Sequence, residues 1–294
     1  MKKLIGTIAL LAMSMTSMNA QENGLYLSLN GGYNFAAGTI KGSAFDLVNK
    51  TKIVNLAGSS VETNENIALS LGKGLNFGGA IGYMFNKNVG AELGFDYLIG
   101  GKTTGSDSET RNSTNFNSSR KNDSEISAKM LQITPSLIIS AGMEKINPYA
   151  KFGMIIGSAK ITSNRNRTNT STFGGSTATT NTFETSTELL TNTGVGFKGA
   201  LGVMFTVNSN ISVFAELTSI NMSLNLKSGT KTKDTTNGVD NLIGKSINDT
   251  QTVYEDTLTT NSPTTVNPNE PSKEATVSVP FSSFGINVGL KYSF

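Results

Sequence analysis

Alternation of apolar and polar residues with a period of two is the feature that most restricts what this chain can fold into. Between residues 25 and 35, leucine and aromatic residues occupy one set of alternate positions, and Tyr26, Ser, Asn and Gly occupy the other. The same pattern runs through residues 77–85 and 89–99, which a short Asn86–Asn88 turn joins. This pattern is typical of β-strands with one apolar face and one polar face. Further strands are predicted around residues 131–140, 149–157, 193–207, 211–220 and 276–294, which makes eight.

The links between these strands alternate between short and long. Short links are expected at residues 86–88, 142–147 and 208–210. Long links, rich in Ser, Thr, Asn and Gly, are expected at residues 38–66, 101–125, 158–191 and 222–275. Four such loops are unusual in a compact soluble domain, whereas outer-membrane barrels have short periplasmic turns and long extracellular loops. The sequence therefore predicts an all-β, eight-stranded antiparallel up-and-down transmembrane β-barrel with four long extracellular loops.

A weak internal repeat accompanies the strands. Residues 79–82, Gly-Ala-Ile-Gly, recur as Gly-Ala-Leu-Gly at residues 199–202, and each copy is followed by Met-Phe, a turn and Ala-Glu-Leu. Two related hairpins of one sheet would produce this similarity, and so would chance among Gly-rich strands.

The N-terminus has the order of a secretory signal peptide. Lys2 and Lys3 precede an apolar run over residues 4–13, and a polar stretch then leads to Ala20. The apolar run is too short to span a bilayer as a helix. We expect a signal peptide at residues 1–20 and the barrel domain at residues 21–294.

The C-terminal strand carries the most specific pattern. Apolar residues alternate with polar or small ones up to the final aromatic residue. This resembles the C-terminal assembly signal of outer-membrane barrels, carried here by Asn287, Gly289, Tyr292 and Phe294. With the signal peptide and the strand layout, the chain resembles OmpA/OmpX-like, porin-family outer-membrane barrels of Gram-negative bacteria. OmpA itself continues into a periplasmic peptidoglycan-binding domain, and the resemblance here does not extend to that domain.

Composition argues against several kinds of chemistry. The chain has no His and no Cys, which removes His-dependent catalysis and the commonest zinc ligands. Its carboxylate pairs lie in polar loops without calcium-loop spacing, and the formal net charge of +3 is spread along the chain. We therefore expect no enzyme activity, no cofactor, no metal and no nucleic-acid partner.

The charges on the strands are more informative. Strand alternation predicts that three acids and three bases point into the lumen: Glu92, Asp96, Lys151, Lys198, Glu216 and Lys291. A charge facing lipid near the midplane would cost roughly 2–4 kcal/mol, which favours the inward assignment. A balanced set in the narrow interior of an eight-stranded barrel favours ion pairs that fill it over a selectivity filter. Glu92, Glu216, Lys151 and Lys291 are expected to meet near the periplasmic end, with Lys198 higher.

These patterns leave three functional hypotheses. The first is a structural and surface-interaction barrel, the second a narrow channel for ions or small solutes, and the third a soluble secreted β-protein. The expected partners are outer-membrane lipid and lipopolysaccharide, the barrel-insertion machinery during assembly, and an unknown extracellular ligand.

Overall fold

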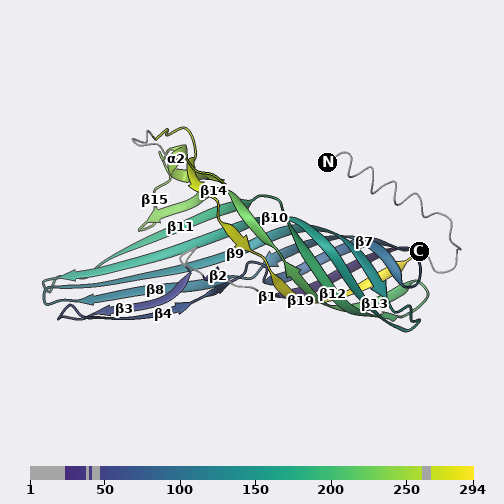
Figure 1. Cartoon of the computed structure of the whole chain (residues 1–294). Helices are drawn as coiled ribbons and strands as arrows, with labels where there is room; N and C mark the ends of the chain where they lie inside the picture. The colour runs from purple at the N-terminus through teal and green to yellow at the C-terminus, as the bar shows by residue number, and fades with distance from the viewer. Residues whose placement is uncertain (1–23, 38–39, 42–46, 260–265) are drawn as a thin grey trace.

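The computed structural model describes residues 24–37, 40–41, 47–259 and 266–294, most of which lie in β-strands (Figure 1). The all-β prediction is confirmed. The expected signal peptide at residues 1–20 lies outside these described ranges. Within them, α2 (Ile247–Thr250) is a single turn, and no helix has the length and apolar character needed to cross a membrane.

Eight strands form a continuous antiparallel ring at one end of the molecule. Each pairs with two neighbours in the order β1-β6-β7-β9-β10-β12-β13-β19, and β19 pairs back onto β1. The closing register places Leu27 opposite Tyr292 and Phe35 opposite Phe284. The strands of the ring are β1 (Gly24–Ala36), β6 (Gly74–Met84), β7 (Val89–Gly100), β9 (Phe116–Ser140), β10 (Ile146–Phe173), β12 (Gly194–Thr206), β13 (Ile211–Asn221) and β19 (Ser283–Ser293).

Asparagine side chains stabilise the three short turns of the ring. The Oδ1 atom of Asn86 accepts hydrogen bonds from the backbone N–H groups of Asn88 and Val89, both at 2.8 Å. Asn208 does the same for Asn210 and Ile211, at 3.0 and 2.8 Å. In the third turn Asn147 accepts from the N–H of Gly142 at 3.0 Å. Such side-chain bonds give the backbone a partner where the strand ladder ends. These turns agree with the predicted short links.

The predicted long loops are instead largely strand, which corrects the expectation of irregular segments. β9 and β10 continue far beyond the ring, and their pairing reaches Phe116 opposite Phe173. The other strands of this extension are β3 (Val48–Val54), β4 (Ser60–Asn66), β8 (Thr103–Asn112), β11 (Thr179–Thr191) and β14 (Ser223–Thr236). They form a sheet in the order β4-β3-β8-β9-β10-β11-β14, in which only β3 and β8 are parallel. We call this sheet the extension.

The remaining elements are short. They are β2 (Ile40–Lys41), β5 (Ala68–Leu69), β15 (Val239–Asp240), β16 (Gln251–Glu255), β17 (Ser272–Ala275) and β18 (Ser278–Pro280). Figure 1 shows α2 and β15 beside β14, which is the edge strand of the extension, and the C-terminus at the opposite end of the molecule, beside the ring.

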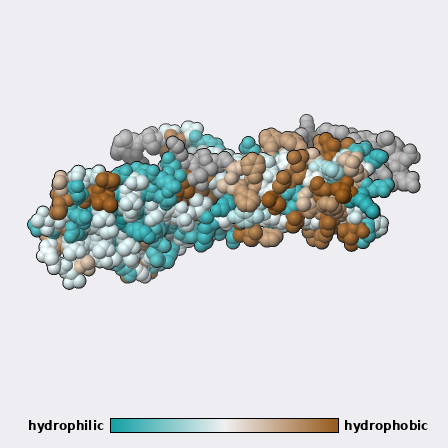
Figure 2. Space-filling view, turned by 90° about the horizontal axis from the view of Figure 1, so that it is seen from below, coloured by the Kyte–Doolittle hydropathy of each residue, from teal (hydrophilic) through white to brown (hydrophobic). Residues whose placement is uncertain are grey.

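The two faces of the ring differ as the sequence predicted. Outward positions carry large apolar side chains such as Leu29, Phe152 and Leu201, which are 71, 63 and 67% exposed. Figure 2 shows apolar side chains concentrated over the ring and polar ones over most of the extension. Inside, the principal apolar cluster lies where the ring meets the extension, and includes Leu47, Leu71, Leu98, Ile126, Met130, Ile155, Ile161, Met222, Leu224 and Phe281. We call this cluster the apolar plug.

Candidate functional site

The interior of the ring carries all six strand charges that the alternation placed there. Glu92 and Asp96 lie on β7, Lys151 on β10, Lys198 on β12 and Glu216 on β13. Lys291 lies on β19. In the ion pairs that join the first five, each side chain is at most 16% exposed. The structure therefore brings most of the predicted residues into direct contact.

Lys151 is the centre of the first group. Its Nζ atom lies 2.8 Å from Oε1 of Glu216 and 3.1 Å from Oε1 of Glu92. Lys151 also lies near two aromatic rings, at 5.4 Å from the centre of Tyr149 and 5.5 Å from that of Phe214. One cation thus lies between two carboxylates in the interior of the ring.

Two tyrosines complete this group, and the sequence analysis did not single them out. The hydroxyl of Tyr26 donates to Oε2 of Glu92 at 2.9 Å, and that of Tyr149 donates to Oε1 of Glu216 at 2.8 Å. Charge-assisted hydrogen bonds of this kind are stronger than those between neutral groups. Both tyrosines are buried, at 2 and 6% exposed.

The weak internal repeat contains a pattern from which these two tyrosines could have been predicted. Tyr26 lies opposite Gly82 on β6, and Gly82 lies opposite Glu92 on β7. On the other side of the ring, Tyr149 lies opposite Gly202 on β12, and Gly202 opposite Glu216. A Cβ atom on Gly82 would lie 2.1 Å from the Tyr26 ring, and one on Gly202 would lie 2.5 Å from the Tyr149 ring. Each glycine therefore leaves the space through which its tyrosine reaches its glutamate.

The remaining charges form two separate contacts. Lys198 pairs with Asp96 at 2.7 Å, and the two side chains are 16 and 4% exposed. Lys291 lines one small cavity together with Glu92 and Lys151, at the level that the alternation predicted, but its direct contact is not with a carboxylate. Its Nζ atom instead lies 3.9 Å from the centre of the Tyr26 ring, a cation–π contact. The aromatic ring of Tyr26 thus takes the place that the prediction gave to a carboxylate.

Uncharged polar side chains are also buried inside the ring, and we call them the polar layer. It consists of buried side chains with at least one polar atom that has no protein partner: Asn34, Asn76, Gln132, Thr134, Thr218, Ser283 and Asn287. Buried atoms of this kind usually bind internal water. The two cavities recorded along the charged part of the lumen are only about 30 Å³ each. Each has room for roughly one or two water molecules, because one water needs about 10–15 Å³.

The four residues of the predicted assembly signal are spread over both faces of β19. Asn287 is buried in the polar layer, whereas Tyr292 and Phe294 are 46 and 67% exposed and their rings pack edge to face at 5.1 Å. The local structure also explains why residue 289 is a glycine, because a Cβ there would lie 2.3 Å from the Leu29 carbonyl oxygen. The role in assembly remains a prediction.

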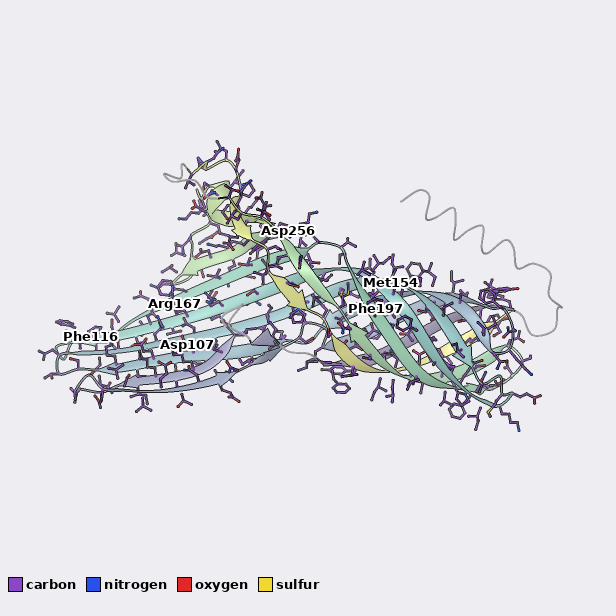
Figure 3. The ribbon with its side chains drawn as sticks, viewed as in Figure 1. Asp107, Phe116, Met154, Arg167, Phe197 and Asp256 are labelled. Atoms are coloured by element: carbon purple, nitrogen blue, oxygen red, sulfur yellow. The ribbon has the colours of Figure 1, made fainter. Side chains whose placement is uncertain are left out.

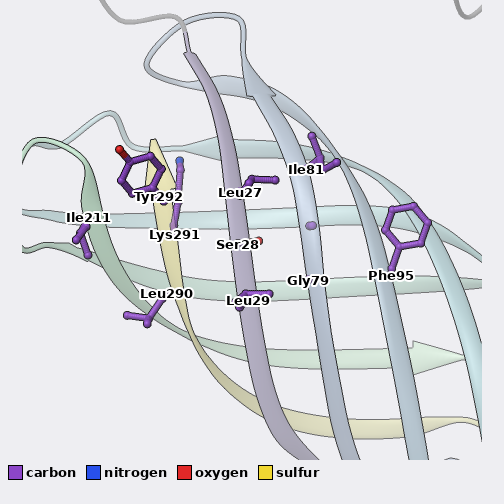
Figure 4. A pocket seen from close by; sticks show the side chains of 11 residues that line it. Leu27, Ser28, Leu29, Gly79, Ile81, Phe95, Ile211, Leu290, Lys291 and Tyr292 are labelled. Atoms are coloured by element: carbon purple, nitrogen blue, oxygen red, sulfur yellow. The ribbon is translucent and has the colours of Figure 1, made fainter. Parts of the chain in front are cut away.

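The outer surface has a shallow apolar hollow of about 600 Å³ around Gly79 (Figure 4). Its walls include Leu27, Leu29, Ile81 and Phe95, whose side chains face outward. The hollow is therefore part of the apolar outer face of the ring. As for metal sites, no group of three or more acidic side chains in the described ranges converges well enough to hold an ion.

A closed sheet with an apolar outside and a charged, polar inside is the arrangement expected of a β-barrel in a bilayer. The family model described as outer membrane protein beta-barrel domain matches residues 5–242. The chain belongs to this family and is located in the outer membrane.

The crystal structure of Ail, the attachment invasion locus protein of Yersinia pestis, is similar at 11% identity and a TM-score of 0.34. That similarity covers 93% of this chain and 100% of Ail. No curated protein matches the sequence.

Proposed function

We propose that the eight-stranded ring is a closed transmembrane barrel that holds the extension at the cell surface for contact with molecules outside the cell. The observation that carries this proposal is the apolar plug across the end of the lumen nearest the extension. Leu98, Ile155 and Phe281 in the plug are each 0% exposed. The role is structural and interactive rather than enzymatic.

The filled lumen supports a closed barrel over the alternative of a narrow channel. An ion moving along the axis would meet two ion-paired groups, around Lys151 and Lys198, and then the apolar plug. An apolar constriction opposes the passage of hydrated ions. A selectivity filter would also favour one sign of charge, whereas this lumen has both.

The orientation follows from the lengths of the links. The three Asn-stabilised turns lie at the end of the ring that holds the C-terminus, and they fit the short periplasmic turns of bacterial barrels. The extension then faces the outside. On this proposal, lipid and lipopolysaccharide surround the apolar outer face, and the insertion machinery handles the barrel during assembly.

Planar-bilayer recording tests the closed lumen. The refolded wild-type protein is expected to pass no large steady current. Replacing both glutamates (Glu92→Gln with Glu216→Gln) removes both partners of Lys151, and should lower the unfolding midpoint and raise conductance. Glu184→Gln with Glu188→Gln is a matched control, because these carboxylates lie on the exposed extension. Large currents through the wild-type protein would support the channel instead.

Epitope insertion tests the orientation. Gly174 and Gly175 form an exposed turn at the tip of the extension, where a Cβ would meet nothing within 4 Å. An epitope between them should bind antibody on intact cells. The same epitope between Asn86 and Lys87 should bind only after the outer membrane is opened. The reverse result would overturn the proposed orientation.

A further inference from the structure

All four arginines of the chain lie on one face of the extension. In the β8–β9 pairing, Arg120 lies opposite Glu109, and Arg111 lies two residues beyond Glu109 on the same face. In the β9–β10 pairing, Arg167 lies opposite Asn122 and Arg165 lies opposite Ser124. Because paired residues share a face and side chains alternate along a strand, the pairing register places all four on the same side.

This face continues the inner face of the ring. On β9, Ser124 is followed along this face by the buried Ile126. On β10, Arg165 is followed towards the ring by Ser163 and then Ile161. Ile126 and Ile161 both belong to the apolar plug. The opposite face has a different character. A cavity of about 550 Å³ on that side is lined by Asp123, Glu125 and Glu184, with Lys233 as its cation. Positive charge on the arginine face is therefore a property of one side of the sheet.

A cavity of about 290 Å³ lies on the arginine face. Its lining includes Arg120, Arg165 and Arg167 together with Asp107, Asn122 and Phe183. Figure 3 shows Arg167 and Asp107 within the extension, between the ring and the tip at Phe116. The volume is close to the lower end of the usual range for ligand pockets, about 300–1,000 Å³.

The side chains of the cavity offer three kinds of interaction. The guanidinium of Arg167 lies 4.8 Å from the centre of the Phe183 ring, a cation–π contact that leaves the positive charge at the cavity. Asn122 donates to Oδ2 of Asp107 at 2.9 Å, so an amide and a carboxylate stand side by side. Phe183 adds an aromatic surface. Cation, amide, carboxylate and aromatic ring together suit a ligand that has both anionic and hydroxyl groups.

The ion pairs of Arg120 and Arg111 are long. Arg120 approaches Asp107 and Glu109 at 3.7 and 3.6 Å, and Arg111 approaches Glu109 at 3.4 Å. Charge-assisted hydrogen bonds are usually about 2.7–2.9 Å, so these pairs are longer than well-formed ones. An incoming oxyanion can therefore replace the carboxylates at modest cost. Arginine is also the side chain best suited to bind phosphate or sulfate through two parallel N–H groups.

We propose that this cavity binds an anionic saccharide, a sugar chain that carries phosphate or sulfate groups. The proposal rests on the proposed function, because it needs the extension to lie outside the cell. The arginines bind the oxyanions, and Asp107 and Asn122 bind sugar hydroxyls. A DNA duplex fits less well, because its backbone offers phosphates but no free sugar hydroxyls for Asp107 and Asn122.

The test measures binding of dextran sulfate and of neutral dextran to the full-length protein refolded in detergent. Arg165→Gln with Arg167→Gln is expected to weaken dextran sulfate binding about tenfold or more, as for arginines at the centre of an interface. Lys121→Gln with Lys233→Gln removes the same charge from the opposite face and should change binding less than about twofold. Heat-modifiable migration on a gel verifies that each variant is folded. Arg120→Gln is a second variant to test if the double arginine variant does not fold.

A second arm distinguishes the two sources of such a saccharide. Lipopolysaccharide core oligosaccharide is compared before and after phosphatase treatment. Loss of binding on treatment indicates the phosphates of the cell's own surface, whereas binding of dextran sulfate alone indicates a sulfated polymer from outside.

Three results would overturn the proposal. Equal losses in the arginine and lysine variants would mean non-specific attraction, unchanged binding in both would mean no site, and tighter binding of a DNA duplex would replace the saccharide. A wrong orientation of the barrel appears in the epitope experiment and leaves this binding measurement unaffected, so the two failures are distinguishable.

Discussion

The hydroxyl of Tyr149 donates a 2.8 Å hydrogen bond to Oε1 of Glu216, the same oxygen that Lys151 approaches at 2.8 Å. On the other side of Lys151, Tyr26 and Glu92 form the equivalent pair at 2.9 Å. One lysine thus lies between two Tyr–Glu pairs whose glutamates occupy equivalent positions of the sequence repeat. This arrangement leads to the first two predictions.

Replacing Lys151 with methionine should destabilise the protein strongly. The substitution keeps the length of the side chain but leaves Glu92 and Glu216 without their cation in a closed lumen. Breaking a buried pair in this way typically costs about 3–5 kcal/mol. Lys160→Met is the matched control, because Lys160 pairs with Glu188 at 49 and 40% exposure, and an exposed pair contributes about 0–1 kcal/mol. The urea midpoint of unfolding of each variant is measured, with heat-modifiable migration on a gel as the readout. Equal midpoints for the two variants would contradict the prediction.

Adding a methyl group at Gly82 or Gly202 should displace the tyrosine opposite. The new Cβ would lie 2.1 or 2.5 Å from an atom of the Tyr26 or Tyr149 ring, so each ring must move away from its glutamate. We expect Gly82→Ala and Gly202→Ala to cost about 1–3 kcal/mol each, the usual range for overpacking. Gly199→Ala is the control, because a Cβ at Gly199 meets nothing within 4 Å. Similar losses at Gly199 and Gly202 would show that the cost arises from the strand backbone and not from the tyrosine.

The turn after β14 should loosen in acid. A hydrogen bond from the Asn241 side chain, and a second one from Lys231, hold the pKa of the Asp234 carboxyl below its ordinary value of 3.8. A lowered pKa in the folded state means that the stabilisation is present above pH 3.8 and is lost as the pH falls through the lower, folded value. Protection of the amides within residues 234–241 against hydrogen exchange, measured relative to the unprotected rate at the same pH, should therefore fall at low pH.

A single substitution should reproduce this effect at neutral pH. Asp234→Asn removes the charge that accepts both hydrogen bonds, so exchange in the same turn should be fast at pH 7. Asp256→Asn, at an exposed position of the same part of the chain, is the control and should leave exchange in the turn unchanged. Slow exchange in Asp234→Asn would show that the carboxylate does not hold the turn.

The aromatic end of β19 should matter for assembly more than for stability. Tyr292 and Phe294 are exposed on the outer face, so replacing both with serine removes little buried contact. If they form the assembly signal, the Tyr292→Ser with Phe294→Ser variant should be nearly absent from the outer membrane of expressing cells. Phe284→Ser with Ile286→Ser removes two outward apolar residues of the same strand and should be incorporated better. Normal levels of the first variant in the membrane fraction would contradict the signal.

The sequence alone determined which side of the ring each strand residue faces. A side chain every second residue points inward, and lipid outside imposes apolar residues on the other positions. For that reason the inward positions of Glu92, Lys151 and Glu216 could be predicted from alternation, and the short turns from their Asn residues.

The tertiary structure decided which of these residues meet. Lys198 and Asp96 are 102 positions apart in the chain, and no local pattern links them. Tyr26 reaches Glu92 across Gly82 only because β1, β6 and β7 pair in this register. The pairing of β1 with β19 likewise places Lys291 against the ring of Tyr26 rather than against a carboxylate.

The strands of the extension could not be predicted from the sequence, for a different reason. Apolar alternation appears where one face of a strand is buried or meets lipid, and both faces of most of the extension meet water, as in residues 163–173 of β10. Backbone hydrogen bonds form a sheet there without requiring apolar side chains, so Ser-, Thr- and Asn-rich segments that read as loops became strands. The sequence determined the faces of the ring, and the pairing of distant strands decided the contacts within it and the sheet beyond it.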